Sequence, residues 1–208
     1  MRVWILSLLL FALPAAAQED RGALVTALEG AVSRVQGADK KTLAAFERLE
    51  AGEFLALDNA KLTLVFFATG QQESYQGSGR LEIGPGEGKP WGLAAPVIKK
   101  LPDFLVKQIA RTPTLVAQGR AGVTRLRAIA TPEAIVKVEE SYRRMRMESV
   151  AGDLNPEMYR LSALFEMKAF DAVESAVRDL EQLQPANKEA LLLASLYRKA
   201  LRNAQNAR

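Results

Sequence analysis

The spacing of apolar residues changes once along the chain, near residue 131, and this change constrains the fold more than any other feature. Before it, apolar and polar residues alternate in short runs separated by turn residues, a pattern typical of strands. After it, apolar residues recur every three to four positions, which is typical of amphipathic helices. The sequence therefore predicts an α+β protein, in which a small sandwich-like or barrel-like β domain precedes a domain of antiparallel helical hairpins.

The strand pattern extends over residues 23–88. The run KLTLVFFA at 61–68 has apolar residues on both of its alternating sides, which indicates a central strand covered on two faces. A turn is expected at Asp58–Asn59, and a tight reversal at Thr69–Gly70. Residues 89–131 predict an irregular connection, with about two helical turns from residue 103 and either an added strand or a linker at 122–129.

Gly77, Ser78 and Gly79 raise the question of a phosphate-binding loop. A dinucleotide-binding loop needs a third glycine and a helix that begins directly after it, whereas the strand-like run RLEI follows here. A P-loop needs a terminal Lys-Ser or Lys-Thr pair, which GPGEG at 84–88 lacks. We therefore interpret these glycines as positions where the backbone bends or where two strands approach closely.

Helix-start signals divide residues 132–204 into four expected helices. Thr131 can cap a helix whose first residue is Pro132, where the missing proline N–H costs nothing. The pair Asn155–Pro156 repeats this arrangement, and Asn187 is placed to cap the last helix. Because the turns between these helices are short, neighbouring helices should pack antiparallel.

Residues 1–17 have the three parts of a secretory signal peptide. A positive start at Arg2 is followed by an apolar run at 3–13 and by small residues that end at Ala17. The apolar run is about half the roughly 20 residues that a membrane span needs. We therefore expect cleavage after Ala17, a mature chain without a transmembrane segment, and a periplasmic location.

Composition narrows the chemistry, because the chain contains no His and no Cys. These absences exclude a Ser-His-Asp triad, thiol catalysis, disulfides and the usual metal ligands. No nucleophile motif is present, and the neighbouring acids Glu47 and Glu50 are interpreted as a solvated turn or helix face. The sequence thus predicts a protein that is not an enzyme, with no catalytic residue, no cofactor and no metal. Its mild net charge of +4 and its expected export argue against nucleic acid as a partner.

Positive charge is concentrated in residues 99–146, which hold 11 Lys or Arg against 4 Asp or Glu, a net of +7. Arg143, Arg144 and Arg146 cluster at the end of an expected helix. They either face solvent near a helix C-terminus, which favours cations, or bind a partner. The candidate partners are an acidic protein of the envelope, an anionic cell-wall polymer and lipid headgroups. Trp91 allows two interpretations, packing over a sheet edge or a stacking platform for a ligand.

The β half resembles the FecR-type periplasmic domain over residues 23–88. The resemblance rests on Gly30-Ala31-Val32, on the motif LEAGEFL at 49–55, on the alternating strand at 62–67, and on the final run GSGRLEI at 77–83. It implies a small β domain that serves as a binding module. The motif L-x-x-G-[DE]-x-L is also similar to that of SH3-like bacterial cell-wall modules.

The helical half resembles tetratricopeptide material. Asn155 to Asn187 spans one repeat length of about 33–34 residues, with Phe170 at the position of the loop aromatic residue and Pro185 ending the second helix. The alternative is an ordinary helical bundle. Together the two resemblances imply protein–protein binding in envelope sensing or assembly, and the alternative is a module that binds the glycan of peptidoglycan.

Overall fold

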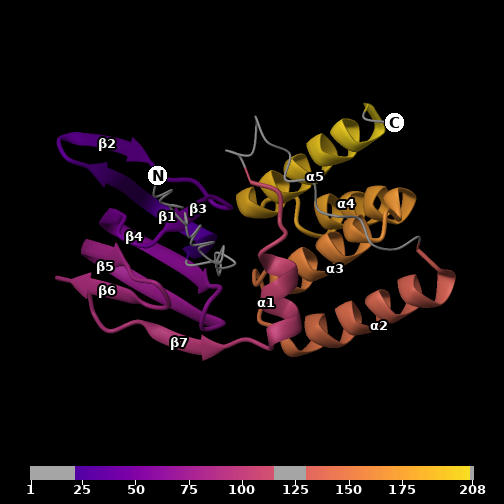
Figure 1. Ribbon diagram of the computed structural model, residues 1–208, viewed down its shortest axis with the longest axis horizontal. Helices are drawn as coiled ribbons and strands as arrows, with labels where there is room; N and C mark the ends of the chain where they lie inside the picture. Colours follow the sequence, from indigo (N-terminus) through magenta and orange to yellow (C-terminus); the bar gives the residue numbers. More distant parts are fainter. Residues whose placement is uncertain (1–21, 115–129, 207–208) are drawn as a thin grey trace, which may run out of the picture.

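A computed structural model describes residues 22–114 and 130–206, in which an antiparallel sheet of seven strands is followed by five helices (Figure 1). The predicted α+β class is confirmed. The sheet forms one end of the molecule and the helices α2 to α5 form the other, with α1 between them. The expected signal peptide at 1–17 and the segment 122–129 lie outside the described residues. Among those that are described, no helix is long and apolar enough to cross a bilayer.

Three long strands pair side by side in the centre of the sheet: β1 (Gly22–Gln36), β4 (Phe54–Phe66) and β5 (Gln71–Ile83). Four short strands extend them. Two of these pair with β1, namely β2 (Asp39–Thr42) and β3 (Arg48–Glu50). The other two pair with opposite ends of β5, namely β6 (Gly88–Trp91) and β7 (Val97–Lys100).

The three long strands bend at the same level, where each contains a residue with a positive φ angle. These residues are Gly30 (φ 85°), Asn59 (φ 43°) and Gly77 (φ 116°), and the strand pairing shifts register beside them. The turn expected at Asp58–Asn59 is wrong, because β4 continues through these residues as a bulge. Asn59 tolerates the left-handed conformation as turn residues do, so its turn signal marks a bend in the strand instead.

The strand β4 is covered on both faces, as its sequence predicts. Leu62, Leu64 and Phe66 point into a core enclosed by the bent sheet. Val65 and the half-buried Phe67 belong to a second core, which also contains the buried residues of the helices. Since this second core includes residues of both the sheet and the helices, the two halves of the chain pack into one body.

The stretch expected to be an irregular connection contains β7 and α1 (Asp103–Ile109). The helix α1 buries Leu105, Val106 and Ile109 in the core that the sheet and the helices share. Arg48 of β3 donates a hydrogen bond to the carbonyl of Ala110 just after α1. The segment therefore joins the sheet to the helices, although its elements are too short to give a clear periodicity.

The remaining helices are α2 (Pro132–Glu148), α3 (Asn155–Glu166), α4 (Phe170–Leu183) and α5 (Lys188–Asn206). Two predicted caps are confirmed: the Thr131 hydroxyl accepts a hydrogen bond from Ala134 N, and Asn187 Oδ1 accepts one from Ala190 N. Asn155 does not cap α3, because it is the first residue of that helix and its side chain reaches toward the sheet. This side chain contributes to the groove described next.

Candidate functional site

A groove of about 840 Å³ opens between α1, α2 and the start of α3. The end of β7 and the α2–α3 connection complete its walls. Apolar and aromatic side chains form much of its surface, and four charged residues lie at its border. The principal apolar lining residues are Leu101, Phe104, Leu105, Met145, Pro156 and Tyr159.

The wall on the α1 side results from the short amphipathic pattern of that helix. Because Leu105 and Val106 face the shared core, Phe104 points away from it and keeps 52% of its surface exposed. The ring of Phe104 packs edge-on against Tyr159 of α3, with ring centroids 5.8 Å apart and an interplanar angle of 84°. This edge-to-face geometry is favourable for aromatic pairs, so the two rings form a fixed apolar surface that one side leaves open to solvent.

Asn155 forms a polar point on the opposite wall. The residue is 4% exposed, and its side-chain amide Nδ2 donates to Gln72 Oε1 of β5 at 2.6 Å. Its carbonyl oxygen Oδ1 is buried and accepts no hydrogen bond from any described residue. An unpaired buried acceptor costs about 1–3 kcal/mol, and because this oxygen is buried it is not exposed to a ligand in the groove.

Gln108 of α1 presents a second acceptor of the same kind. Its amide Nε2 donates to Glu166 Oε2 at 3.3 Å, which directs the side chain along α3. Its Oε1 is buried, and within the described part of the chain it has no hydrogen-bond partner. Both side chains line the groove, but their acceptor oxygens are buried and are not exposed to a ligand.

The charges at the border of the groove balance. The ammonium nitrogen Nζ of Lys99 on β7 lies 3.9 Å from the carboxylate oxygen Oδ2 of Asp153, just before α3. The other two charged residues, Arg144 and Glu148, lie on α2. The border therefore does not select strongly for a net charge. The segments beside it expose large apolar side chains instead: Val97 (74%), Ile98 (56%), Met147 (81%) and Val150 (75%).

The three arginines that the sequence nominates have different environments. Arg143 and Arg144 are exposed on α2, and Arg144 lines the groove. Arg146 is directed the other way, toward α3, where its guanidinium donates to both carboxylate oxygens of Glu157 at 3.2 Å. It also donates to the carbonyl of Asp153 at 2.6 Å. Arg146 thus joins α2 to the start of α3, and the three residues do not form one continuous rim.

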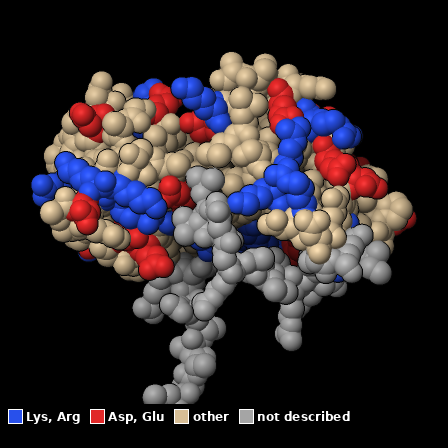
Figure 2. Space-filling view, turned by 90° about the horizontal axis from the view of Figure 1, so that it is seen from above, with Lys and Arg blue, Asp and Glu red and all other residues tan. Residues whose placement is uncertain are grey.

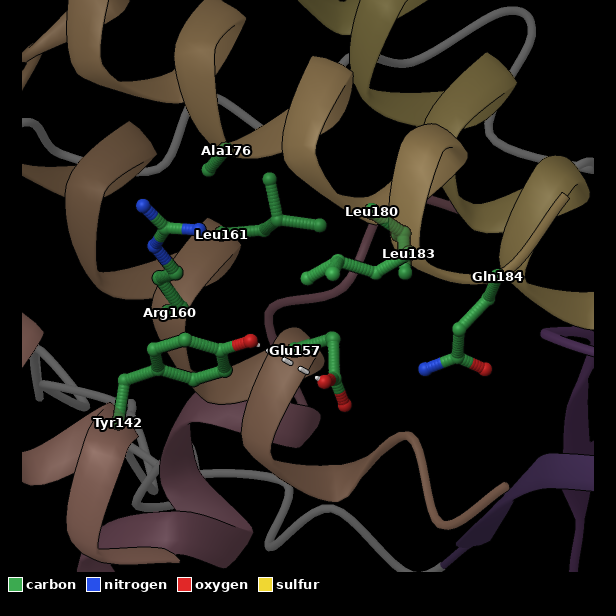
Figure 3. Close-up of a pocket in the computed structure, with 8 residues that line it drawn as sticks. All are labelled: Tyr142, Glu157, Arg160, Leu161, Ala176, Leu180, Leu183 and Gln184. Carbon is green, nitrogen blue, oxygen red and sulfur yellow. Dashed lines mark hydrogen bonds between the residues drawn. The ribbon is translucent and has the colours of Figure 1, made fainter. Parts of the chain in front are cut away.

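Glu157 belongs to a polar network between α2, α3 and α4 (Figure 3). Burial raises the pKa of its carboxyl, and the positive charge of Arg146 opposes that rise. The hydroxyl of Tyr142 donates to the carboxylate at 3.4 Å, and burial raises the pKa of this tyrosine as well. The cavity beside these side chains has a volume of only about 10 Å³, which is room for one water molecule and not for an organic substrate.

Arg160 extends this network to α4. Its guanidinium binds Glu139 at 2.8 Å and Asp179 at 2.9 Å, and it lies 4.9 Å from the centre of the Tyr142 ring. Each cation of the network is paired with carboxylates on neighbouring helices. The network therefore holds the helices together, and its polar groups are already occupied by one another.

A buried carboxylate also lies within the sheet. Glu73 of β5 is 1% exposed and accepts hydrogen bonds from the Tyr75 hydroxyl and, at 2.9 Å, from the backbone N–H of Gly88. Burial, followed by the hydrogen bond to Glu73, raises the pKa of Tyr75, which keeps its hydroxyl protonated. This arrangement fastens β6 to β5. In the described ranges, no three acidic side chains gather where they could hold a metal ion.

Trp91 packs against Phe54 on the outer face of the sheet. Their rings stack with centroids 6.2 Å apart, and the two residues remain 48% and 44% exposed. Trp91 therefore packs on the sheet and also keeps an accessible face. On the face of the molecule that Figure 2 shows, Lys and Arg side chains intermingle with Asp and Glu over both the sheet and the helices.

Comparison of the chain with models of known protein families, with curated proteins and with solved structures gives no match. The site must therefore be interpreted from its own residues. Sequence reasoning missed Phe104, Gln108 and Asn155. The only available signal was the apolar pair Val97–Ile98 directly before two lysines, which is unusual for a solvated connection.

Proposed function

We propose that the protein is a non-enzymatic interaction protein of the bacterial periplasm, which binds a segment of a partner protein in the groove between α1, α2 and α3. In this proposal the sheet is a FecR-like binding module and the helices are tetratricopeptide-like. The partner acts with it in envelope sensing or assembly. The observation that carries the proposal is the open groove with its apolar and aromatic side chains, beside which further large apolar side chains are exposed.

The dimensions and chemistry of the groove support binding. Its volume lies within the range of roughly 300–1,000 Å³ that is common for ligand sites, and its lining combines apolar and aromatic residues with polar and charged ones. Exposed apolar side chains beside it extend the surface available to a protein partner. Among the described residues, the buried carboxylates of Glu73 and Glu157 are engaged in structural networks, so the groove is better suited to a ligand than the surroundings of either acid.

Affinity capture from an envelope extract tests this proposal. The variant Phe104→Glu places a charge at the centre of the groove wall. The control Val136→Glu places the same charge on α2 outside the groove lining, at a residue with 54% exposure against 52% for Phe104. We expect a specific protein that wild type and Val136→Glu capture and Phe104→Glu does not. Equal capture by all three proteins would contradict the proposal.

The exposed Phe54–Trp91 pair favours a second candidate function, binding of the glycan of peptidoglycan by the sheet. Arg80, which is paired across the sheet with Trp91, and Lys89 add polar groups that sugars and their carboxylates can bind. Sedimentation with purified peptidoglycan tests this candidate. Loss of co-sedimentation in Trp91→Ala, with retention in Phe104→Glu, would favour glycan binding over the groove proposal.

A further inference from the structure

The strand β7 has one edge that no described strand covers. Among the described residues it pairs only with β5, with Lys99 opposite Gln72 and Ile98 opposite Glu73. Just beyond it, the N–H of Leu101 donates to the Gly70 carbonyl at 2.9 Å. Residue pairs in an antiparallel ladder alternate between hydrogen-bonded and non-hydrogen-bonded. Leu101 is therefore at a hydrogen-bonded position, and so is Lys99 two residues before it. Ile98 and Lys100 are at the positions in between, so their backbone N–H and C=O groups point away from β5 toward the open edge.

This edge leads directly into the groove. Lys99 lines the groove, and Leu101 and Pro102 continue its wall into α1. Asn155 lies beside the same strand, because its side chain donates to Gln72, the residue opposite Lys99. The open backbone edge of β7 and the groove therefore adjoin each other.

We infer that this surface binds an extended peptide segment of a partner protein, which adds to β7 as a further strand and continues into the groove. The inference rests on the proposed function and specifies the conformation of the ligand. Ile98 and Lys100 supply donors and acceptors at the spacing of a strand, as in other proteins that bind peptides by strand addition. Past the strand, the peptide follows the groove wall formed by Leu101, Pro102 and α1. An apolar side chain of the peptide packs on Phe104 and Tyr159.

Two features favour a single extended segment over other occupants. The outward backbone groups of Ile98 and Lys100 need a partner with free N–H and C=O groups at the spacing of a strand. A helical ligand has its backbone N–H groups bonded internally and would leave the edge of β7 unpaired. The balanced charges at the border agree with a segment that is recognised through its backbone and apolar side chains.

The probe is a phage-displayed library of random peptides of about ten residues, which is long enough to cover a strand and the groove. Two variants at one position separate the backbone from the side chain. Ile98→Pro removes the outward N–H and fills its place with the proline ring, while Ile98→Ala removes the side chain and keeps the N–H. Proline is tolerated on a strand edge whose N–H faces solvent, so the sheet should remain folded.

We expect selected peptides to bind Ile98→Ala with nearly wild-type affinity and Ile98→Pro at least about tenfold more weakly, which corresponds to about 1.4 kcal/mol. A scan of N-methylated peptides leaves the protein unchanged and provides a second measurement. Methylation should weaken binding at alternate residues over the part of the peptide that pairs with β7.

Several results would overturn the inference: no enriched peptide, equal affinity of the two Ile98 variants, or N-methyl sensitivity without a two-residue period. A dimer of the protein that Ile98→Pro dissociates would assign the edge to a second copy and would also overturn it. The proposed function has a separate outcome. If Phe104→Glu loses the captured partner and Ile98→Pro keeps it, the groove remains the binding site and only strand addition is wrong.

Discussion

Replacement of Arg146 by alanine should destabilise the fold, although sequence reasoning expected this residue either to face solvent or to bind a partner. The Arg146 side chain is 26% exposed, and that of its partner Glu157 is 6% exposed. Its guanidinium also donates to the carbonyls of Asp153 and Val150, which follow α2. Alanine at this position leaves the carboxylate of Glu157 buried with only the Tyr142 hydroxyl as a side-chain partner.

The size of the expected loss of stability follows from the burial of this ion pair. Removing one partner of a fully buried ion pair costs about 3–5 kcal/mol. Because a quarter of the Arg146 side chain is exposed, solvent screening reduces the expected loss to about 2–3 kcal/mol. For a chain of this size, that loss corresponds to a fall in Tm of about 4–12 °C. Arg143→Ala and Arg144→Ala remove exposed charges from the same helix and should each change stability by less than about 0.5 kcal/mol.

The pH dependence of this loss identifies its cause. Burial raises the pKa of Glu157, so below that pKa the folded state binds a proton that the unfolded state binds only at lower pH. The free energy of unfolding therefore falls as pH rises from the unfolded pKa of Glu157 through its folded pKa. Without Arg146 the pKa of Glu157 in the folded state rises further. The stability that Arg146→Ala loses relative to wild type should therefore be larger at about pH 8 than at about pH 5.

Thermal unfolding monitored by circular dichroism at both pH values measures these effects. The double variant Arg146→Ala with Glu157→Gln should recover part of the loss, because it removes the unpaired buried charge. A Tm for Arg146→Ala equal to that of Arg143→Ala would refute this reasoning. A deficit of the same size at both pH values would show that the carboxylate of Glu157 is not its source.

Two further predictions concern the sheet and the N-terminus. In Gly79→Ala the new Cβ would lie 2.6 Å from the Trp91 carbonyl oxygen, so we expect a loss of about 1–3 kcal/mol in urea unfolding, and an unchanged midpoint would be evidence against this close approach. The exported protein should begin at Gln18, as measured by its intact mass, and a membrane-inserted form that retains Met1 would exclude cleavage of a signal peptide.

Local signals in the sequence predicted the fold class and several element boundaries. The two-sided apolar pattern of β4 correctly indicated coverage on both faces, because alternation along a strand directly determines which side chains share a face. The caps at Thr131 and Asn187 were predictable because capping depends only on residues within one turn. Gly77 and Gly79 lie within β5. Gly77 has a positive φ angle and Gly79 lies against the backbone of β6, in agreement with their interpretation as structural glycines.

The groove was not predictable in this way, because it depends on residues that are distant in the sequence. Phe104 and Tyr159 meet only when α1 packs beside α3, and Asn155 meets Gln72 only when α3 approaches the sheet. The helix-start pattern at Asn155 suggested a cap, which is a local role, whereas tertiary packing uses its side chain elsewhere. The different environments of Arg146 and Arg143 were not predictable for the same reason, because Glu157, the partner of Arg146, lies on the next helix.

The most direct test of partner binding in the groove is site-specific photocrosslinking in intact cells. A photoreactive phenylalanine analogue replaces Phe104, and the matched control replaces Val136, which is similarly exposed but does not line the groove. We expect irradiation to produce one dominant covalent adduct with another protein from position 104 and none from position 136, with mass spectrometry locating the crosslink in a single segment of the partner. No adduct from position 104, or the same adduct from both positions, would contradict the assignment of the groove as the binding site.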